Sequence, residues 1–262
     1  TVKLSQRLHE LASAAPCFVW PNMGHGGLAL GAVAAGGGLP PQRIKNVFWG
    51  DAFSNAALRA ALADADVSFE QTDDIAGRIA DCVATGGAVG VFRGRMEWGP
   101  RALGNRSILA LPRPGTTERL NHLLERSDFM PFAPALLDEA ATQLLHAPEA
   151  ARDAARFMTC CFTATKELRE RHAAAVHVDG TVRAQLVDAE TNPDFAAILH
   201  ALRARTGSAV VLNTSFNRHE EPIVRTPAEA LATFAAARLD GLALGPFWIE
   251  PRRQRATPSP AR

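Results

Sequence analysis

The stretch over residues 94–107 constrains the fold most strongly, because glycine and proline exclude a helix along its length. Gly99 and Pro100 interrupt a helical hydrogen-bonding pattern, and Gly104 interrupts it again four residues later. Backbone N–H groups that lack helical partners are then free to point at a ligand. Because the apolar run over 88–92 predicts a strand just before it, we expect this stretch to be a loop at a strand end.

Arg95, Arg101 and Arg106 are spread along this stretch, which we call the arginine segment. Each arginine can present a planar fork of N–H donors to phosphate or carboxylate oxygens, and Ser107 adds a hydroxyl. A solvated basic loop is the alternative interpretation, but apolar residues such as Trp98 lie between the arginines and favour burial. The arginine segment therefore predicts an anion-binding site.

Composition excludes several classes of protein. The chain has 262 residues, 47% of them hydrophobic and 21% charged, which is enough to bury one large core or two modest ones. A formal net charge of +1 and few aromatic residues disfavour RNA binding, so anion recognition has to be local. No apolar run reaches the roughly 20 residues of a membrane span, and the first residues do not resemble a signal peptide. We therefore predict a cytoplasmic protein.

Periodicity and turn signals predict a mixed α/β fold. Helices are predicted over residues 4–11, 73–84, 116–125 and 193–205, with further helices beginning near 26, 54 and 226. Strands are predicted over residues 17–20, 67–70, 88–92, 107–111, 133–137, 157–163, 209–212 and 241–249. Asp179-Gly180 is a two-residue turn signal, which predicts a hairpin between 176–178 and 181–183.

Further polar residues follow the predicted elements and can reach the same ligand as the arginine segment. Arg126 follows a predicted helix, Asn213 and Ser215 follow a predicted strand, and Arg183 lies on the strand that leaves the hairpin. Ligands of open α/β sheets bind beside loops at strand ends. Turn capping by Asn213 and Ser215, and solvation of Arg183, are equally compatible with these positions.

Four motifs occur in one order along the chain: residues 94–108, Pro131-Phe-Ala-Pro134, Asn213-Thr-Ser-Phe-Asn217 and Glu221-Pro-Ile-Val224. Together they resemble the carboxy-terminal part of the O-carbamoyltransferases of nodulation-factor and antibiotic biosynthesis, over residues 2–251. The resemblance implies a YrdC-like twisted mixed sheet with flanking helices, preceded by a partial actin-like α/β segment. Residues 1–52 would be the remnant of an amino-terminal actin-like carbamoyl-transfer domain, 53–252 the YrdC-like domain and 253–262 a disordered tail.

The resemblance also implies an activity. In that family the YrdC-like domain forms carbamoyl adenylate from carbamoyl phosphate and ATP, with Mg²⁺, and the actin-like domain passes the carbamoyl group to a hydroxyl of a small-molecule acceptor. Both substrates carry clustered negative charge, which suits preorganised arginines. The residues implied in catalysis are Arg95, Arg101, Arg106 and Arg126, and those implied in binding the nucleotide and the carbamoyl group are Ser107, Arg183, Asn213 and Ser215. The start without methionine, directly in a helix pattern, suggests a fragment or a split product, with a separate amino-terminal half as partner.

Three positions depart from the family pattern. Leu124 and Met130 stand where the family usually has a lysine and an arginine, so either nearby arginines compensate or adenylate formation is weakened. His25 stands where the family usually has a metal-binding aspartate, and because histidine also ligates iron and zinc, the resemblance implies such an ion there. The alternative function is a non-catalytic or degenerate nucleotide-binding module, the partner of a split carbamoyltransferase.

Overall fold

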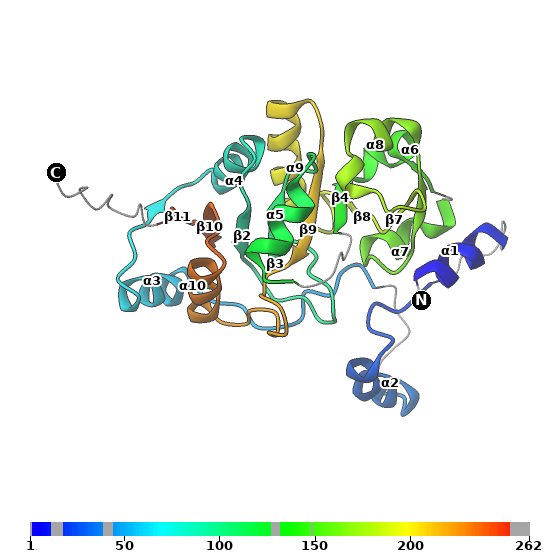
Figure 1. The fold of residues 1–262 in the computed structure, drawn as a ribbon. Helices are drawn as coiled ribbons and strands as arrows, with labels where there is room; N and C mark the ends of the chain where they lie inside the picture. The colour runs from blue at the N-terminus through cyan, green and yellow to red at the C-terminus, as the bar shows by residue number, and fades with distance from the viewer. Residues whose placement is uncertain (1, 12–17, 39–43, 127–131, 148, 252–262) are drawn as a thin grey trace.

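Apolar strands and amphipathic helices alternate along the chain and build a mixed α/β fold around one large sheet (Figure 1). The structure is a computed structural model, and it describes residues 2–11, 18–38, 44–126, 132–147 and 149–251. The tail predicted to be disordered, 253–262, lies outside the described residues.

Two sheets contain the strands. Their bounds are β1 Glu70–Gln71, β2 Val89–Phe92, β3 Arg106–Ala110, β4 Ala133–Leu137, β5 Leu145–His146, β6 Phe162–Ala164, β7 Thr181–Val182, β8 Gln185–Val187, β9 Val210–Ser215, β10 Gly241–Leu244 and β11 Phe247–Ile249. Eight strands form the large sheet, in the order β1-β11-β10-β2-β3-β9-β4-β8, and β5-β6-β7 form the small one. In the large sheet β10 and β2 are parallel, as are β4 and β8, and the other neighbours are antiparallel. The predicted mixed sheet with flanking helices is confirmed.

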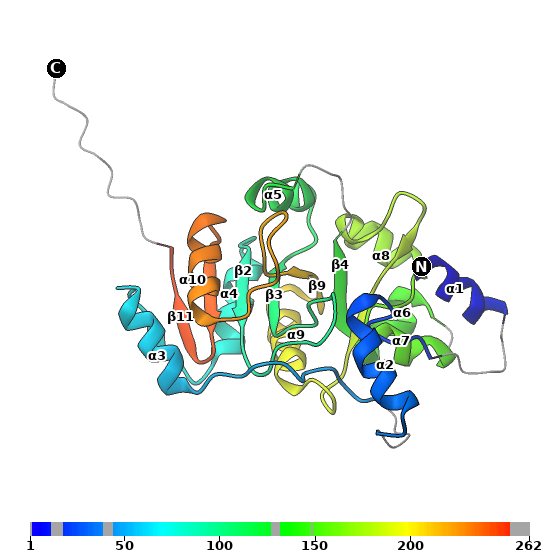
Figure 2. The same ribbon diagram turned by 90° about the horizontal axis from the view of Figure 1, so that it is seen from below.

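Helices cover the sheet on both faces and at both ends. Their bounds are α1 Val2–Leu11, α2 Leu28–Ala35, α3 Asn55–Asp64, α4 Ile75–Ala84, α5 Thr116–Leu123, α6 Ala141–Leu144, α7 Arg152–Arg156, α8 Lys166–Arg171, α9 Pro193–Thr206 and α10 Pro227–Ala236. Figures 1 and 2 show α3 and α10 together near β11, and α6, α7 and α8 near β4 and β8 at the other end. None of the described helices is long and apolar enough to cross a membrane.

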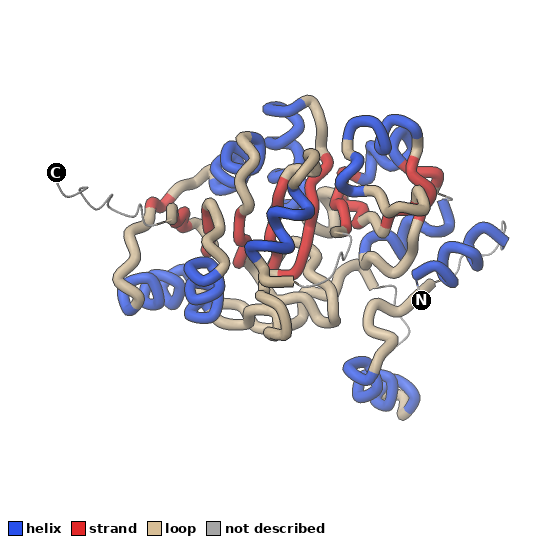
Figure 3. Tube along the Cα trace, viewed as in Figure 1, coloured by secondary structure: helices blue, strands red, loops and turns tan. Residues whose placement is uncertain are grey.

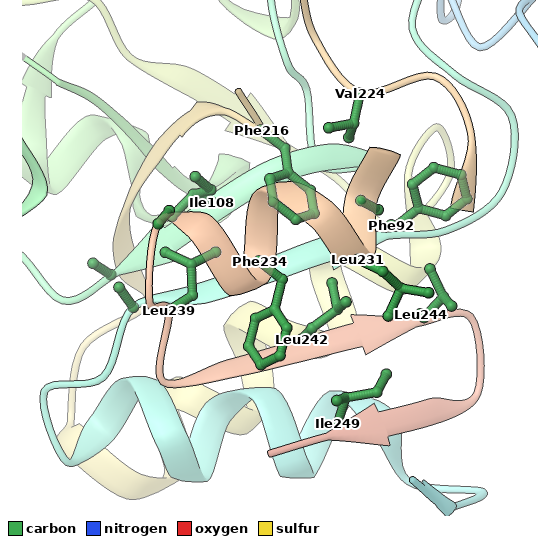
Figure 4. Close-up of a cluster of buried hydrophobic side chains, with 14 of the residues drawn as sticks. Phe92, Ile108, Phe216, Val224, Leu231, Phe234, Leu239, Leu242, Leu244 and Ile249 are labelled. Carbon is green, nitrogen blue, oxygen red and sulfur yellow. The ribbon is translucent and has the colours of Figure 1, made fainter. Parts of the chain in front are cut away.

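Alternation along the strands separates two apolar layers. In β9, Val211 packs in the cluster that contains α4 and α9, whereas Leu212 packs in the cluster that contains α3, α5 and α10. Leu109 and Ile108 of β3 divide in the same way. Figure 4 shows part of the cluster that contains α3, α5 and α10, where Phe234 of α10 lies close to Leu242 of β10. The central strands are therefore buried on both faces, and the ligand site has to lie at a strand end.

Helix ends follow local sequence signals. Thr226 and Glu229 form a capping box at the start of α10, with Pro227 in the first turn. Ser54 accepts a hydrogen bond from the Ala57 N–H at 3.2 Å and begins α3. Gly207, with φ of 73°, ends α9 in the left-handed conformation that glycine favours.

Several predicted strands are wrong in extent. The segment over 241–249 is a hairpin rather than one strand, because Gly245, with φ of 58°, turns the chain between β10 and β11. Of the predicted strand over 157–163, only residues 162 and 163 are extended, as part of β6, because Phe157 directly follows α7. Of the predicted strand over 67–70, only residue 70 is in a strand, as the first residue of β1.

The predicted hairpin at Asp179-Gly180 is half correct. The turn forms, because the Gly180 N–H donates to the His177 carbonyl at 2.9 Å. Residues 176–178 are not a strand, however, because β7 pairs with β6 instead.

The amino-terminal part also differs from expectation. Residues 18–20 form no strand, and residue 17 lies outside the described residues. A short 3₁₀ turn, His25–Gly27, leads into α2, as the glycines predict, but no residue of α2 is buried. Figure 1 shows α2 apart from the sheet. The described residues of the expected actin-like segment thus contain its helix without its strand.

Candidate anion-binding site

A cavity of about 190 Å³ lies where β9 ends, beside the arginine segment and the start of β4. It is lined by Pro100, Arg101, Ala102, Arg126, Phe132, Ala133, Met158, Arg183, Asn213, Thr214, Ser215 and His219. Three of these residues are arginines, and none of the lining residues in the described part of the chain is Asp or Glu. Figure 3 shows loops gathered beneath the central strands, and the arginine segment is one of them.

The three cavity arginines carry positive charge without a matching acid. Burial, together with the neighbouring charge of Arg101, lowers the pKa of Arg183 to about 10. Burial also lowers the pKa of Arg101 and of Arg126. Within the described ranges, Arg101 and Arg183 have neither an ion pair nor a hydrogen bond, and the buried Nε of Arg183 is unpartnered.

Arg126 is held, but by neutral groups. Its guanidinium donates to Thr214 Oγ1 at 3.1 Å and lies 5.4 Å from the centre of the Phe132 ring. Arg93, by contrast, forms a 2.8 Å ion pair with Asp194. Because desolvated cations are normally paired, the cavity has a local excess of positive charge that an anion would neutralise.

The arginine segment is a loop that leads from β2 into β3, as predicted, but its N–H groups at Leu103, Gly104 and Asn105 are bound within the segment. The Glu97 side chain is 5% exposed, and its Oε1 accepts hydrogen bonds from the backbone of Leu103 and Asn105, each at 2.7 Å. The Gly104 N–H donates to Ser107 Oγ at 2.9 Å. The expectation of free N–H donors is therefore wrong at these positions, since acceptors within the segment already bind them.

Side chains from other elements hold the carbonyl groups of the same segment. The Leu103 carbonyl accepts from Gln185 Nε2 at 3.0 Å and from Asn192 Nδ2 at 3.1 Å. Arg93 Nε donates to the Gly104 carbonyl at 2.9 Å. These bonds fix the backbone that presents Arg101 to the cavity.

The structure does not bring Arg95, Arg106 and Ser107 to the cavity. Arg106 is fully buried, and its Nη1 donates to the carbonyl groups of Arg93 at 2.6 Å and of its own neighbour Asn105 at 2.9 Å. Arg95 donates to two backbone carbonyls of the segment before α3, at 3.1 and 2.7 Å. Both arginines hold the loop together, and Ser107 does so by accepting from Gly104.

The other predicted residues do converge. Arg101, Arg126, Arg183, Asn213 and Ser215 all line the cavity, although they come from four separate parts of the chain. The Asn213-Thr-Ser stretch belongs to β9 itself, rather than to a loop after it.

Sequence reasoning missed part of the wall. Phe132 and Met158 form its apolar side, and Met158 has a left-handed φ of 55°, for which the sequence gives no signal. Glu97 and Phe132 lie inside recognised motifs, which could have found them, whereas His219 lies two residues beyond one.

The three residues that depart from the family pattern lie in different surroundings or outside the described residues. Leu124 is fully buried in the cluster with Phe132, so its side chain belongs to the core. Met130 lies outside the described residues. His25 is exposed, and the residues that the structure describes contain no group of three or more His, Cys, Asp or Glu side chains placed to hold a metal ion. The described residues therefore do not fit an iron or zinc site at His25.

Comparison with known proteins places these features in context. Residues 80–251 match the family described as "Carbamoyltransferase C-terminus". The nodulation protein NolNO of Sinorhizobium fredii is 40% identical over 245 residues, which cover 90% of this chain and 36% of that protein. The 3'-hydroxymethylcephem-O-carbamoyltransferase of Amycolatopsis lactamdurans is 31% identical over 175 residues, 66% of this chain and 32% of that protein. This chain thus spans less than half the length of these relatives.

A solved structure shows a looser likeness. The crystal structure of full-length HypF, in a phosphate- and nucleotide-bound form, aligns with 68% of this chain and 22% of that chain. The TM-score is 0.45 and the sequence identity is 19%.

Proposed function

This chain belongs to the carbamoyltransferase C-terminus family, and we propose that its three-arginine cavity binds carbamoyl phosphate and, with ATP, forms carbamoyl adenylate. The observation that supports this proposal most is the cluster of Arg101, Arg126 and Arg183 without an acid among the described lining residues. Such a cluster suits a ligand with two or more negative charges.

The reaction balances with one water molecule. Water releases carbamate and phosphate from carbamoyl phosphate, and a carbamate oxygen then attacks the α-phosphorus of ATP as pyrophosphate leaves. Negative charge develops on phosphoryl oxygens in both steps, so guanidinium groups that are already fixed in place stabilise the transition states. Because the described lining residues include no carboxylate, Mg²⁺ would arrive bound to the phosphates of ATP and to water.

Each side of the cavity has its own task in this proposal. Arg101 and Arg183 bind the phosphate of the donor, since neither has a partner within the described residues. Arg126, oriented by Thr214 and Phe132, binds the second charged group. Phe132 and Met158 exclude water from the uncharged part of the ligand.

Transfer of the carbamoyl group needs more than this chain. We place it in the amino-terminal part that the longer relatives have, either joined to this sequence or as a separate partner, with a hydroxyl of a small molecule as acceptor. The division at residues 52 and 53 belongs to the same proposal, as does an iron or zinc ion with ligands from that other part.

Release of pyrophosphate tests the proposal. We expect the chain to release pyrophosphate from ATP only when carbamoyl phosphate is present, and Arg183→Met to lower the rate by about two orders of magnitude. Arg203→Met is the matched control, because Arg203 pairs with Glu139 on the surface and does not line the cavity. Absence of both pyrophosphate release and phosphate binding would contradict the proposal.

A binding module without turnover is the second candidate. It is favoured by Leu124, because a buried leucine replaces a lysine that the resemblance implies near the ligand. In that case the chain binds phosphate and ATP, and loses both with Arg183→Met, but releases no pyrophosphate.

A further inference from the structure

The helix α1 has its apolar side turned outwards. Its buried residues are all polar, namely Ser5, Gln6 and His9. Its leucines are exposed instead, Leu4 to 59%, Leu8 to 43% and Leu11 to 81%. A surface helix normally buries its apolar stripe and exposes its polar face, so the orientation of α1 is the reverse of the usual one.

The three leucines form one continuous surface, which we call the leucine stripe. They are four and three residues apart, a spacing that places them on the same side of a helix, as in the seam of a coiled coil. Two contacts fix α1 with this side outwards. The Cys161 N–H donates to the Val2 carbonyl at 3.3 Å, and Lys3 forms an ion pair with Asp179.

An apolar groove of about 920 Å³ lies between α3 and α10. Leu231, Phe234 and Leu239 line it and are each at most 7% exposed. Ala61 of α3 and Ala232 of α10 line it as well, and such small side chains leave room for those of another helix. Figures 1 and 2 show α3 and α10 at one end of the molecule and α1 at the other. The leucine stripe therefore does not cover the groove of its own copy.

The stripe and the groove carry opposite charges. Beside the stripe, α1 has two bases and one acid, Lys3, Arg7 and Glu10. The groove is lined by two acids and one base, Asp64, Glu250 and Arg238. Such complementarity selects a partner and sets its orientation. An anionic lipid headgroup would instead meet two carboxylates, so the groove suits a basic helix with an apolar side better than a membrane lipid.

We propose that the leucine stripe of one copy of this chain binds in the apolar groove of a second copy. Since the two surfaces lie at opposite ends of the molecule, the contact is head-to-tail, and each copy can bind two neighbours. The helix has ten residues, fewer than the roughly 20–30 on each side of a standard interface, so we expect a dissociation constant in the micromolar range. Neither surface lines the three-arginine cavity, so this association goes beyond the proposed function and does not depend on it.

Sedimentation velocity on the full chain tests the association. Between about 5 and about 200 µM, we expect the average mass to rise with concentration above that of the monomer. Because a head-to-tail contact leaves a free surface at each end, species larger than a dimer should appear at the highest concentrations.

Two variants place a charge in the contact at exposed positions. Leu8→Glu brings an acid against the acidic groove, and Ala232→Glu fills the groove. We expect each to weaken association by about 10-fold or more. Leu28→Glu, at an exposed leucine of α2, and Ala63→Glu, at an exposed alanine of α3 outside the groove, are the matched controls and should associate like the unmodified chain. Circular dichroism and thermal unfolding verify that all four variants fold.

A mixture of the two variants tests the direction of the contact. The Ala232→Glu protein keeps its leucine stripe, and the Leu8→Glu protein keeps its groove. An equimolar mixture therefore has one intact contact, and we expect dimers but no larger species. A contact between two identical surfaces would not be restored by mixing.

Four results would overturn the inference. The first is a full chain that stays monomeric up to about 200 µM. The second is association that Leu28→Glu abolishes and Leu8→Glu does not, which would place the contact on α2. The third is a mixture that stays monomeric although each variant alone has lost association. The fourth is a monomeric chain that binds phosphatidylglycerol vesicles and loses this binding with Ala232→Glu, since the groove would then bind lipid.

Discussion

Arg183 and Arg93 show how neighbours decide what a buried arginine can do. Arg93 donates to Asn192 Oδ1 at 2.9 Å and pairs with Asp194, so its donors and its charge are occupied. Arg183 has no such partner within the described residues, and burial lowers its pKa to about 10. A group with donors left over and its charge unopposed is the one that can bind an incoming anion.

Arg183→Met should therefore weaken binding and strengthen the fold. The pKa of Arg183 is lowered in the folded chain, so its charge opposes folding at neutral pH. This penalty begins to decrease only as the pH rises through about 10, and it is lost above the ordinary pKa of arginine. Without the guanidinium, we expect phosphate affinity to fall about 10-fold or more, and the free energy of unfolding at pH 7 to rise by about 1 kcal/mol after solvent screening.

Titration calorimetry and urea unfolding measure the two effects of Arg183→Met. Arg203→Met, which removes a surface ion pair, should change the unfolding free energy by less than about 0.5 kcal/mol and leave phosphate binding alone. A fold weakened by Arg183→Met would show that this arginine stabilises the empty protein, which contradicts the argument.

Leu124→Lys tests a second residue. The Leu124 side chain is fully buried among apolar neighbours. A lysine at this position therefore has to bury its charge or leave the core. We expect the free energy of unfolding to fall by about 3 kcal/mol, measured by urea unfolding, with no gain in pyrophosphate release. Leu124→Met, of similar volume, should cost less than about 1.5 kcal/mol. A stable lysine variant with faster turnover would show instead that this position faces the substrate.

At the scale of elements, Glu97 is the centre of the arginine segment. Its Oε1 binds three backbone N–H groups, the third being that of Arg106 at 3.3 Å. Glu97→Gln keeps the shape and removes the charge, so we expect a loss of about 1 to 2 kcal/mol in unfolding free energy and several-fold weaker phosphate binding.

Glu229→Gln is the control for this element. Glu229 also binds two backbone N–H groups, at 2.7 and 3.2 Å, but in the capping box of α10, and it does not line the cavity. It should lower stability and leave phosphate affinity unchanged. If both variants affect binding equally, general loss of stability is the cause, and Glu97 has no special part in placing Arg101.

The elements that could be predicted from sequence are those with their own start and stop signals. The strand over 133–137 matches β4, and α9 begins at Pro193 and ends before Gly207, as predicted. The strand over 157–163 was wrong because a short apolar run does not show whether a helix or a strand will bury it. Sequence reasoning also found the loop but not which of its arginines face the ligand, because that depends on backbone carbonyls that distant segments supply to Arg95.

At the scale of the whole molecule, the arginine segment is hydrogen-bonded to residues 44–51, which lie before the domain to which the sequence assigned the segment. The Trp98 N–H donates to the Val47 carbonyl at 2.7 Å, and the Met96 N–H donates to the Asp51 carbonyl at 2.9 Å. Figure 1 shows the segment before α3 running beneath the central strands. These hydrogen bonds cross the proposed boundary after residue 52, so we infer that residues 44–51 support the cavity from the other side of that boundary.

Two truncations test this inference. A chain that starts at residue 44 keeps every cavity-lining residue and the bonds of residues 44–51 to the arginine segment, so its phosphate affinity should stay within about 3-fold of the full chain. A chain that starts at residue 53 loses those bonds and the packing of Val47, and each backbone bond contributes about 0.5 to 1.5 kcal/mol. We expect at least 10-fold weaker binding by calorimetry and a lower unfolding temperature. If the chain that starts at residue 53 binds phosphate as well as the full chain, residues 44–51 do not support Arg101. If the chain that starts at residue 44 already binds phosphate more weakly than the full chain, the support comes from the part that contains α1 and α2. Neither helix lines the cavity.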